Sequence, residues 1–258
     1  MIMSLGGILL IDPKASSDGL VRSLSVVMPV YNEVDTIERV VRDYYDRIIR
    51  NTENSELIIV EDGSTDGSRE ILKGLQKSVF FTLLTADERG GYANAFKRGL
   101  QSAGSRYILF TDSDGQHDPG DYLSMLAGIE DCDIVSGFRN VRHDPIIRII
   151  LSRIFNFLIF VLFGLRVRDI NSGFKLIKKK VIDTVLCEVT VLDYCVMSEF
   201  IVKAHLLGFK IKEIPVNHFW RMSGKTNIFH SRRLPFIIAK TMLGLLKIKV
   251  QGKPGSRK

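Results

Sequence analysis

Arg-Tyr-Ile-Leu-Phe-Thr (residues 106–111) is followed directly by Asp112, Ser113, Asp114 and Gly115. The apolar part predicts a buried strand, and the acidic part lies where that strand ends. Because Asp112 and Asp114 are two residues apart, an extended backbone can project both carboxylates to the same side. Two such groups repel each other unless a cation lies between them. Hard cations such as Mg²⁺ or Mn²⁺ prefer carboxylate oxygens and often accompany a diphosphate.

Strand-like and helix-like patterns alternate on both sides of this stretch. Asp35 and Glu38 have the spacing of a capping box, which predicts that a helix begins there. Such alternation predicts an α/β fold with a mostly parallel sheet covered on both faces, and ligands of such sheets bind beyond the carboxyl ends of the strands. We expect strands at 24–30, 57–60, 79–84, 107–111 and 133–136, and helices at 35–50, 68–77, 91–103 and 122–129.

Composition and charge narrow the class of partner. The 258 residues can bury a full core, and the net charge of +7 is uneven, because residues 214–258 hold ten Lys or Arg and no Asp or Glu. A basic end predicts an anionic partner: a membrane surface, a nucleic acid or a phosphorylated substrate. No nucleic-acid-binding module is recognisable, so nucleic acid is disfavoured. Three cysteines without CxxC spacing indicate a reducing compartment and no zinc site.

Two stretches, near 146–165 and 232–249, combine apolar runs with flanking Arg and Lys. The uninterrupted apolar part, 154–165, is shorter than the roughly 20 residues that cross a bilayer. It therefore predicts a helix that is buried or lies in the membrane interface. The first 22 residues lack the basic start of a signal peptide. We expect a peripheral protein on the cytoplasmic face of a membrane, without a transmembrane helix, and with or without a membrane partner as anchor.

The polar clusters exclude some nucleotide-binding classes and suggest another. No GxxxxGK[ST] loop is present, and no GxGxxG follows the first strand. Instead PVYNE (29–33), VEDGSTDGS (60–68), GGYANAFKRG (90–99), FTDSDGQHDP (110–119) and SGFRN (136–140) occur in order. Together they resemble the family 2 glycosyltransferases, which have the GT-A fold with a Rossmann-like sheet. The resemblance covers residues 23–226.

The resemblance implies roles for residues at the strand ends. Asp112 and Asp114 become the DxD pair that carries the metal on the diphosphate of a nucleotide-sugar, with Thr111 and Ser113 beside the donor. The residues implied to hold the base and ribose are Pro29, Tyr31, Glu33, Val60 and Asp62.

The second half of the chain resembles the polyprenyl-phosphate branch of that family, which includes dolichol-phosphate mannose synthases. LSRIFN places Ser152, Arg153 and Asn156 where that branch has an S-R-x-x-N motif. This chain departs from the pattern of that branch at Thr226-Asn227, where relatives often have Ser-Lys. The missing lysine concerns the identity of the donor more than the type of reaction. The other residues that carry this resemblance are Gln116, as a further metal ligand, Arg139, Asp169, Ser172, Gly173, Lys175, Arg221 and Lys225.

The resemblance implies an inverting hexosyltransferase that uses Mg²⁺ or Mn²⁺. It would move mannose or glucose from GDP-mannose or UDP-glucose to a polyprenyl or dolichyl phosphate. Arg139 and Arg153 are predicted to place the acceptor phosphate, because planar guanidinium groups bind phosphate in bidentate fashion. Arg221 and Lys225 are predicted to hold the leaving diphosphate, and the predicted catalytic set is Asp114, Arg139, Arg153 and Asp169.

Two alternatives remain open. A hydroxyl acceptor on a polysaccharide or other glycan would need a carboxylate base, for which Asp169, Asp193 and Glu199 are the candidates. A non-catalytic membrane-associated subunit is the remote alternative. His117 is expected to be a turn residue or to support the metal ligands, rather than to bind the metal itself. Apart from Lys175, SGFKLIKKK (172–180) is expected to be a solvated helix start. The expected organisation is an arm at 1–22, the catalytic domain at 23–227 and a basic amphipathic segment at 228–258.

Overall fold

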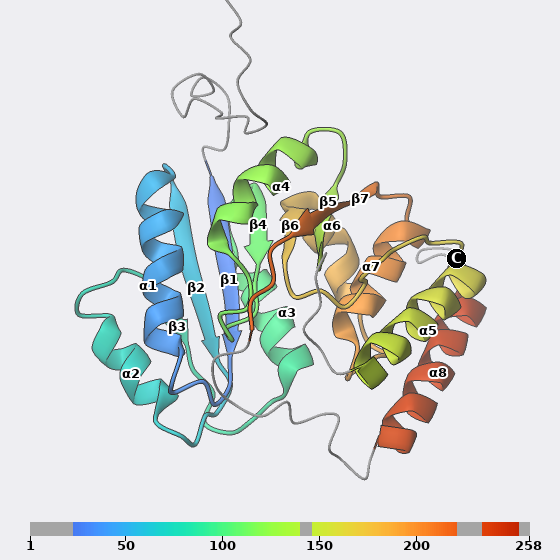
Figure 1. Ribbon diagram of the computed structural model, residues 1–258, viewed down its shortest axis with the longest axis horizontal. Coiled ribbons are helices and arrows are strands. Elements are labelled where there is room, and N and C mark those ends of the chain that lie inside the picture. Colours follow the sequence, from blue (N-terminus) through green and yellow to red (C-terminus); the bar gives the residue numbers. More distant parts are fainter. Residues whose placement is uncertain (1–22, 140–145, 221–233, 253–258) are drawn as a thin grey trace, which may run out of the picture.

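The structure is a computed structural model that describes residues 23–139, 146–220 and 234–252 (Figure 1). Within these ranges one seven-stranded sheet has the order β3-β2-β1-β4-β6-β5-β7. All pairings are parallel except those of β6, which runs antiparallel to β4 and to β5. The strands are β1 (Leu24–Val30), β2 (Ser55–Glu61), β3 (Thr82–Leu84), β4 (Tyr107–Phe110), β5 (Ile134–Arg139), β6 (Lys175–Lys178) and β7 (Ile211–Val216).

The predicted mostly parallel α/β sheet is confirmed, but β6 and β7 were not predicted. The expectation that residues 172–180 form a solvated helix start is wrong for its first part, because 175–178 form β6. Lys175 is fully buried there, since β6 lies between β4 and β5 and helices cover it. A run with so many lysines reads as solvent-exposed in the sequence, and only its pairing with two apolar strands makes it a central strand.

Helices cover both faces of the sheet, and each face has its own core. In β1, Val26 and Met28 belong to one core and Val27 to the other, as the alternation of a strand requires. Helices α1 (Ile37–Arg47), α2 (Ser68–Leu75) and α4 (Tyr122–Ile129) pack on the first core. Helices α3 (Tyr92–Ser102), α6 (Lys179–Val185) and α7 (Val196–Leu206) pack on the second.

Helix α1 begins one residue later than the capping-box pattern predicts. Its N-cap is Thr36, not Asp35, and no side chain caps it. The carbonyl of Glu33 accepts instead from the backbone N–H groups of Thr36 and Ile37, at 3.1 and 2.9 Å. The tight turn after β1 therefore satisfies the first amides of the helix, and the side-chain cap is not needed.

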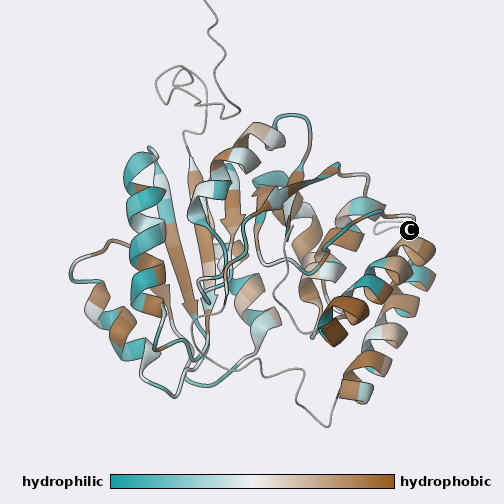
Figure 2. Cartoon of the chain, viewed as in Figure 1, coloured by the Kyte–Doolittle hydropathy of each residue, from teal (hydrophilic) through white to brown (hydrophobic). Residues whose placement is uncertain are grey.

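Helices α5 (Ile146–Phe163) and α8 (Leu234–Gln251) pack side by side, far from α1 and α2 (Figure 1). Arg148 and Arg153 do not interrupt α5, so the helix is longer than the apolar run 154–165 on which the sequence interpretation was based. Among the described residues it is the one helix that is long and apolar enough to cross a membrane. Only Ile159 and Phe163 of α5 are buried, although hydrophobic residues, brown in Figure 2, make up much of both helices.

Candidate active site

A cleft of about 920 Å³ opens beyond the carboxyl ends of β4 and β5. The turn after β4 contributes Asp112, Asp114 and Gln116 to its lining, and the end of β5 contributes Arg139. These four predicted site residues, separated by up to 27 positions in the chain, therefore share one cavity. The loop before α3, one face of α5 and the start of α8 form the other walls.

Asp112 is held by groups from two distant segments. The hydroxyl of Tyr92, the first residue of α3, donates to its Oδ1 at 2.8 Å. A Cβ added to Gly173 would lie 1.8 Å from its Oδ2, so only glycine permits this close approach. Burial first, and then the charge of Asp114, raise the pKa of Asp112 to about 6. Two carboxylates are thus forced together in a poorly hydrated position.

This pair fits a hard divalent cation, whose charge would relieve the repulsion that raises the pKa of Asp112. The part of the chain that the structure describes has no group of three or more His, Cys, Asp or Glu able to hold a metal ion. Further oxygen ligands must therefore come from Gln116, from water or from a substrate, which is how Mg²⁺ is commonly held. The Gln116 amide donates from Nε2 to the carbonyl of Phe219 at 3.0 Å, which fixes its orientation.

Arg139 and Asp169 form a buried bidentate ion pair below the carboxylates. Arg139 Nε lies 2.6 Å from Asp169 Oδ2, and Arg139 Nη2 lies 3.1 Å from Oδ1. Both oxygens of Asp169 are thereby engaged, so the geometry makes it a positioning residue for Arg139. Nearby, the fully buried Lys175 donates to Ser136 Oγ at 2.8 Å, and burial lowers its pKa to about 8. Arg139 therefore reaches the cleft while paired with Asp169, and Lys175 lies buried behind the cleft lining.

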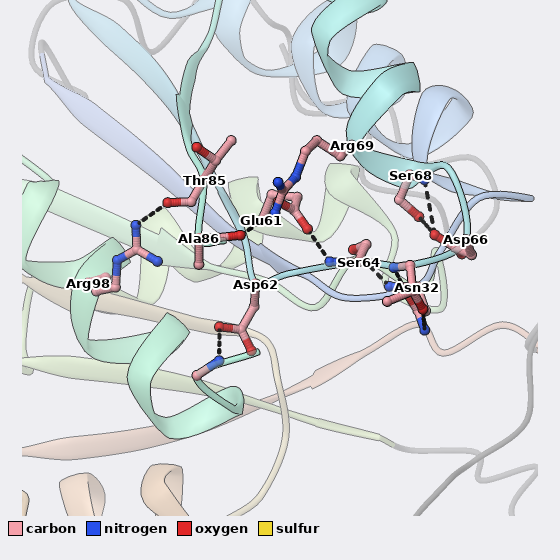
Figure 3. A network of polar contacts seen from close by, with 12 residues as sticks. Asn32, Glu61, Asp62, Ser64, Asp66, Ser68, Arg69, Thr85, Ala86 and Arg98 are labelled. Carbon is pink, nitrogen blue, oxygen red and sulfur yellow. Dashed lines mark hydrogen bonds and ion pairs between the residues drawn. The ribbon is translucent and has the colours of Figure 1, made fainter. Parts of the chain in front are cut away.

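The loops after β1 and β2 are tied to each other (Figure 3). Asn32 accepts on Oδ1 from the backbone N–H of Thr65 at 2.8 Å, and Asp66 accepts from the backbone N–H of Val34 at 3.0 Å. The buried Asp62 accepts from the backbone N–H groups of Gly90 and Gly91, at 3.0 and 2.7 Å. This network fixes the segment before α3 against the end of β2.

The residues predicted to hold a base and ribose lie beside the cleft, at the ends of β1 and β2. Pro29 and Val60 are register partners within the sheet. Tyr31 and Glu33 follow β1, and Arg89 covers the Tyr31 ring, with its guanidinium carbon 4.0 Å from the ring centroid. The stacking face of Tyr31 is therefore occupied by Arg89 in this structure.

Thr111 and Ser113 are both buried at the start of the acidic turn. The Thr111 hydroxyl lies 2.6 Å from the hydroxyl of Tyr44 in α1. This contact ties the turn to the opposite face of the sheet. The Thr111 hydroxyl also donates to the backbone carbonyl of Asp112 at 3.2 Å.

The structure separates Arg153 from the other predicted catalytic residues. Its neighbours Arg148 and Ser152 line the cleft, whereas Arg153 is exposed and lines a different hollow on the outer side of α5. The S-R-x-x-N motif therefore does not bring its arginine to the carboxylates in this structure. Arg221 and Lys225 lie outside the described residues, and so does the Thr226-Asn227 departure.

Several cleft residues had no predicted role. Tyr92 and Arg148 line the cavity. The GGYANAF motif could have pointed to Tyr92. No sequence motif points to Arg148, because its place in the cleft depends on how α5 is rotated about its axis. His117, predicted to lie in the turn or to support the metal ligands, is buried in the cleft wall directly after Gln116 and stacks on Phe174 with centroids 5.0 Å apart. Burial lowers the pKa of His117 to about 3, so it is neutral.

Glu199, a candidate base, has a structural role in this geometry. Its carboxylate accepts from the backbone N–H groups of Thr190, Val191 and Leu192 at 2.6 to 3.0 Å. It also pairs with Lys203 at 3.0 Å. The side chain is almost fully buried, so it holds the segment before α7 in place.

The family model described as glycosyl transferase family 2 matches residues 25–186, well over half of the chain. The chain belongs to glycosyl transferase family 2. It is 28% identical over 210 residues to an undecaprenyl-phosphate 4-deoxy-4-formamido-L-arabinose transferase of Salmonella choleraesuis. That alignment covers 79% of this chain and 62% of the relative, so less than two thirds of the relative's length is represented. An uncharacterized protein of Methanocaldococcus jannaschii is 27% identical, with 82% and 88% of the two chains covered.

Solved structures support the fold. Glucosyl-3-phosphoglycerate synthase from Mycobacterium tuberculosis, in complex with UDP, matches with a TM-score of 0.64 and 20% identity. The match covers 91% of this chain and 82% of that one. The same enzyme in complex with Mn²⁺, UDP and glucosyl-3-phosphoglycerate gives 0.63 at 19% identity. The sheet order and these neighbours confirm the GT-A fold.

Proposed function

We propose that this family 2 glycosyltransferase moves a hexose from a nucleotide diphosphate to the phosphate of a polyprenyl or dolichyl lipid. The observation that carries the proposal is the composition of the cleft beyond β4 and β5. It joins the Asp112–Asp114 pair and Arg139 to apolar side chains of two adjacent helices. From α5 these are Leu151, Ile154, Phe155 and Leu158, and from α8 Leu234, Ile237, Ile238 and Met242.

Such a cavity suits an acceptor with a charged head and an isoprenoid tail. The head can reach Arg139 and Arg148, and the tail can lie between α5 and α8. The Salmonella relative, whose name gives undecaprenyl phosphate as a substrate, supports a lipid phosphate. The exposed apolar side chains of α5 and α8 support peripheral membrane association, because they would face lipid when the mouth of the cleft meets the bilayer.

The donor half of the proposal rests on the carboxylates. A divalent cation, Mg²⁺ or Mn²⁺, held by Asp112, Asp114 and Gln116 would neutralise the charge that develops on the leaving diphosphate. Tyr92 keeps Asp112 in position, and Gly173 allows its approach. Arg221 and Lys225 remain the proposed further partners of the diphosphate. Pro29, Tyr31, Glu33, Val60 and Asp62 are the proposed frame of the base and ribose.

The acceptor phosphate is already anionic near neutral pH, so it needs placement and no general base. Asp169 orients Arg139, and Arg139 and Arg148 place the phosphate oxygen behind the anomeric carbon. A new bond forms from that oxygen to the anomeric carbon while the bond from that carbon to the diphosphate breaks. Attack from the side opposite the leaving group inverts the configuration.

The alternative with a hydroxyl acceptor is disfavoured by the three candidate bases. Asp169 is fully engaged by Arg139, and Glu199 by backbone amides. Asp193 lies at the cleft but pairs with Lys240 of α8 at 2.7 Å. None of the three has the environment of a free carboxylate that could remove a proton from a hydroxyl.

A donor and acceptor screen tests the proposal. Purified protein with Mn²⁺ or Mg²⁺ is mixed with GDP-mannose, UDP-glucose or UDP-N-acetylglucosamine and a short polyprenyl phosphate in detergent. We expect metal-dependent, lipid-extractable sugar from one donor, lost in Asp114→Ala and kept in Asp131→Ala, the same change at an exposed carboxylate. Release of nucleotide without labelled lipid would reject the lipid acceptor. No reaction with any donor would favour a non-catalytic subunit.

A further inference from the structure

The outer side of α5 carries a second hollow, of about 630 Å³, which the proposed transfer reaction does not use. One face of the helix, the loop that follows it and β7 form its walls. The lining residues are Arg153, Asn156, Phe157, Phe160, Arg166, Val167, Arg168 and Glu213.

The loop that contributes Arg166 and Arg168 is held firmly. The Glu213 carboxylate accepts from the backbone N–H of Arg168 at 2.8 Å and of Asp169 at 3.1 Å. Asn156 donates its side-chain N–H to the carbonyl of Arg168. The backbone that presents the arginines is thereby fixed to both α5 and β7. The carboxylate of Glu213 is used by the amides, and the hollow keeps a net positive charge.

The arginines of the hollow lack the ion pairs that several other exposed arginines make. Within the described ranges no ion pair joins Arg153, Arg166 or Arg168 to a carboxylate, whereas Arg42 on α1 pairs with Glu38 at 2.9 Å and Arg50, just after α1, with Asp46 at 3.1 Å. The guanidinium of Arg166 lies against the Phe160 ring, 5.1 Å from its centroid. Unpaired guanidinium groups beside aromatic rings suit an anion whose neighbouring atoms are apolar.

An exposed apolar stripe lies next to the hollow on the same helix. Its members recur every three or four residues, so they share one face of α5. Phe157 belongs to both the stripe and the hollow and is 63% exposed. A cationic hollow beside an apolar ridge matches a phospholipid and does not match a nucleic acid, which has no apolar tails. The stripe comprises Ile146, Ile150, Ile154, Phe157 and Val161.

We propose that Arg153, Arg166 and Arg168 form a binding site for the phosphate headgroup of an anionic membrane phospholipid. The acyl chains would lie along the stripe. The arginine hollow is separate from the acceptor position, because Arg148 and Ser152 face the cleft from another side of α5, and Ile154 lies where the stripe meets the cleft wall. It fixes the rotation of α5 on the membrane surface, and with it the direction in which the cleft opens. The inference stands on the outer face of α5 and does not depend on which sugar is transferred.

Flotation of the full-length protein with vesicles tests this inference. The vesicles are phosphatidylcholine alone or phosphatidylcholine with phosphatidylglycerol. Each basic side chain near an anionic surface contributes about 1 kcal/mol, so Arg166→Gln/Arg168→Gln should lower partition onto phosphatidylglycerol vesicles by roughly tenfold or more. Arg42→Gln/Arg50→Gln, called the α1 variant, removes the same net charge from α1 and the turn that follows it, and it should change partition by less than about twofold. On phosphatidylcholine vesicles all variants should bind alike.

Arg153→Gln provides an independent variant, because Arg153 comes from α5 and not from the loop. It should lower phosphatidylglycerol binding by about fivefold. Equal losses in the α1 and loop variants would show that only net charge matters and would overturn the site. A wild type that shows no preference for phosphatidylglycerol would also overturn the site. So would a wild type that resists extraction by alkaline carbonate, as a membrane-spanning protein does. Binding to duplex DNA that the loop variant alone loses, without any lipid preference, would assign the arginines to nucleic acid.

Transfer activity separates this inference from the proposed function. In detergent with a short polyprenyl phosphate, Arg166→Gln/Arg168→Gln should retain the wild-type rate, since these arginines do not line the cleft. Loss of vesicle binding with normal transfer in detergent supports the headgroup site. Loss of transfer in detergent would place the arginines in the catalytic machinery and overturn it.

Discussion

Helices α1 and α5 both flank the sheet, yet they place their apolar side chains in opposite environments. Helix α1 buries Ile37, Val40, Val41 and Tyr44 against the sheet. Helix α5 is far more apolar but buries only Ile159 and Phe163. Arg42 and Arg47 of α1 pair with carboxylates one turn away, whereas Arg153 of α5 has no such pair among the described residues. Apolar content alone therefore does not make a core helix: α1 presents charged side chains on its outer side, whereas α5 leaves apolar side chains exposed.

Among the changes that test this comparison, the largest effect is expected on the transfer rate, from a substitution in the proposed donor site at Asp112. Asp112→Asn should lower transfer about 10³-fold, because one of the two negative charges facing the metal is lost. The fold should persist, since the amide can still accept from Tyr92. Steady-state kinetics across metal concentrations checks this. A variant that keeps more than about a tenth of the wild-type rate would contradict the role of the pair.

The next largest effect is expected on stability, from the buried ion pair between Arg139 and Asp169. Asp169→Asn leaves the guanidinium of Arg139 buried without its counter-charge, which should cost about 3 kcal/mol in the free energy of unfolding. Urea denaturation measures this cost. Asp183→Asn, which removes the exposed partner of Lys179 on α6, is the control and should cost less than about 0.5 kcal/mol. Similar costs for both would mean that the Arg139–Asp169 pair is not buried in solution.

The pH dependence of stability tests the burial of His117. Its folded-state pKa of about 3 lies below the ordinary 6.5, so the unfolded chain binds the proton first as pH falls. Its contribution to stability is therefore complete above about pH 6.5 and lost progressively towards pH 3. At pH 5 this amounts to about 2 kcal/mol.

His117→Phe keeps the stacking on Phe174 and should remove this loss. The pKa of Asp112 shifts in the opposite direction: burial and the neighbouring Asp114 raise it to about 6. Asp112 therefore adds to the free energy of unfolding as pH falls from about 6 towards the ordinary carboxyl value of 3.8. The quantity to measure is therefore the difference between wild type and variant in urea denaturation at pH 7 and pH 5. A difference that does not change with pH would show that His117 is accessible to protons.

The smallest effects compare the two helices directly. Val41→Ala in α1 removes two buried methyl groups and should lower the free energy of unfolding by about 1.5 kcal/mol. Ile154→Ala in α5 should change it by less than about 0.5 kcal/mol, because that side chain is 51% exposed. It should instead weaken vesicle binding by a few-fold. Equal costs in buffer would mean that another surface covers α5 in solution.

Much of the fold could be predicted because, in the first half of the chain, the spacing of apolar residues matches the strands and helices that form there. β1, α4 and the acidic turn agree with the predicted ranges closely, since their apolar residues pack against immediate neighbours in the α/β unit. β6 could not be predicted: its lysines read as solvated, and its direction is set by partners on both sides. The ends of helices shifted by one to three residues, as the backbone contacts after β1 illustrate at Thr36.

The sequence by itself determined the alternation of strands and helices, the two carboxylates behind β4 and the apolar character of α5. These follow from the spacing of residues along a few turns or one strand, which fixes local conformation. Only the tertiary structure decided that Arg148 faces the cleft and Arg153 does not, that Asp169 binds Arg139, and that Gly173 meets Asp112. A helix can rotate about its axis without changing its own pattern, and contacts between distant segments depend on how the layers pack.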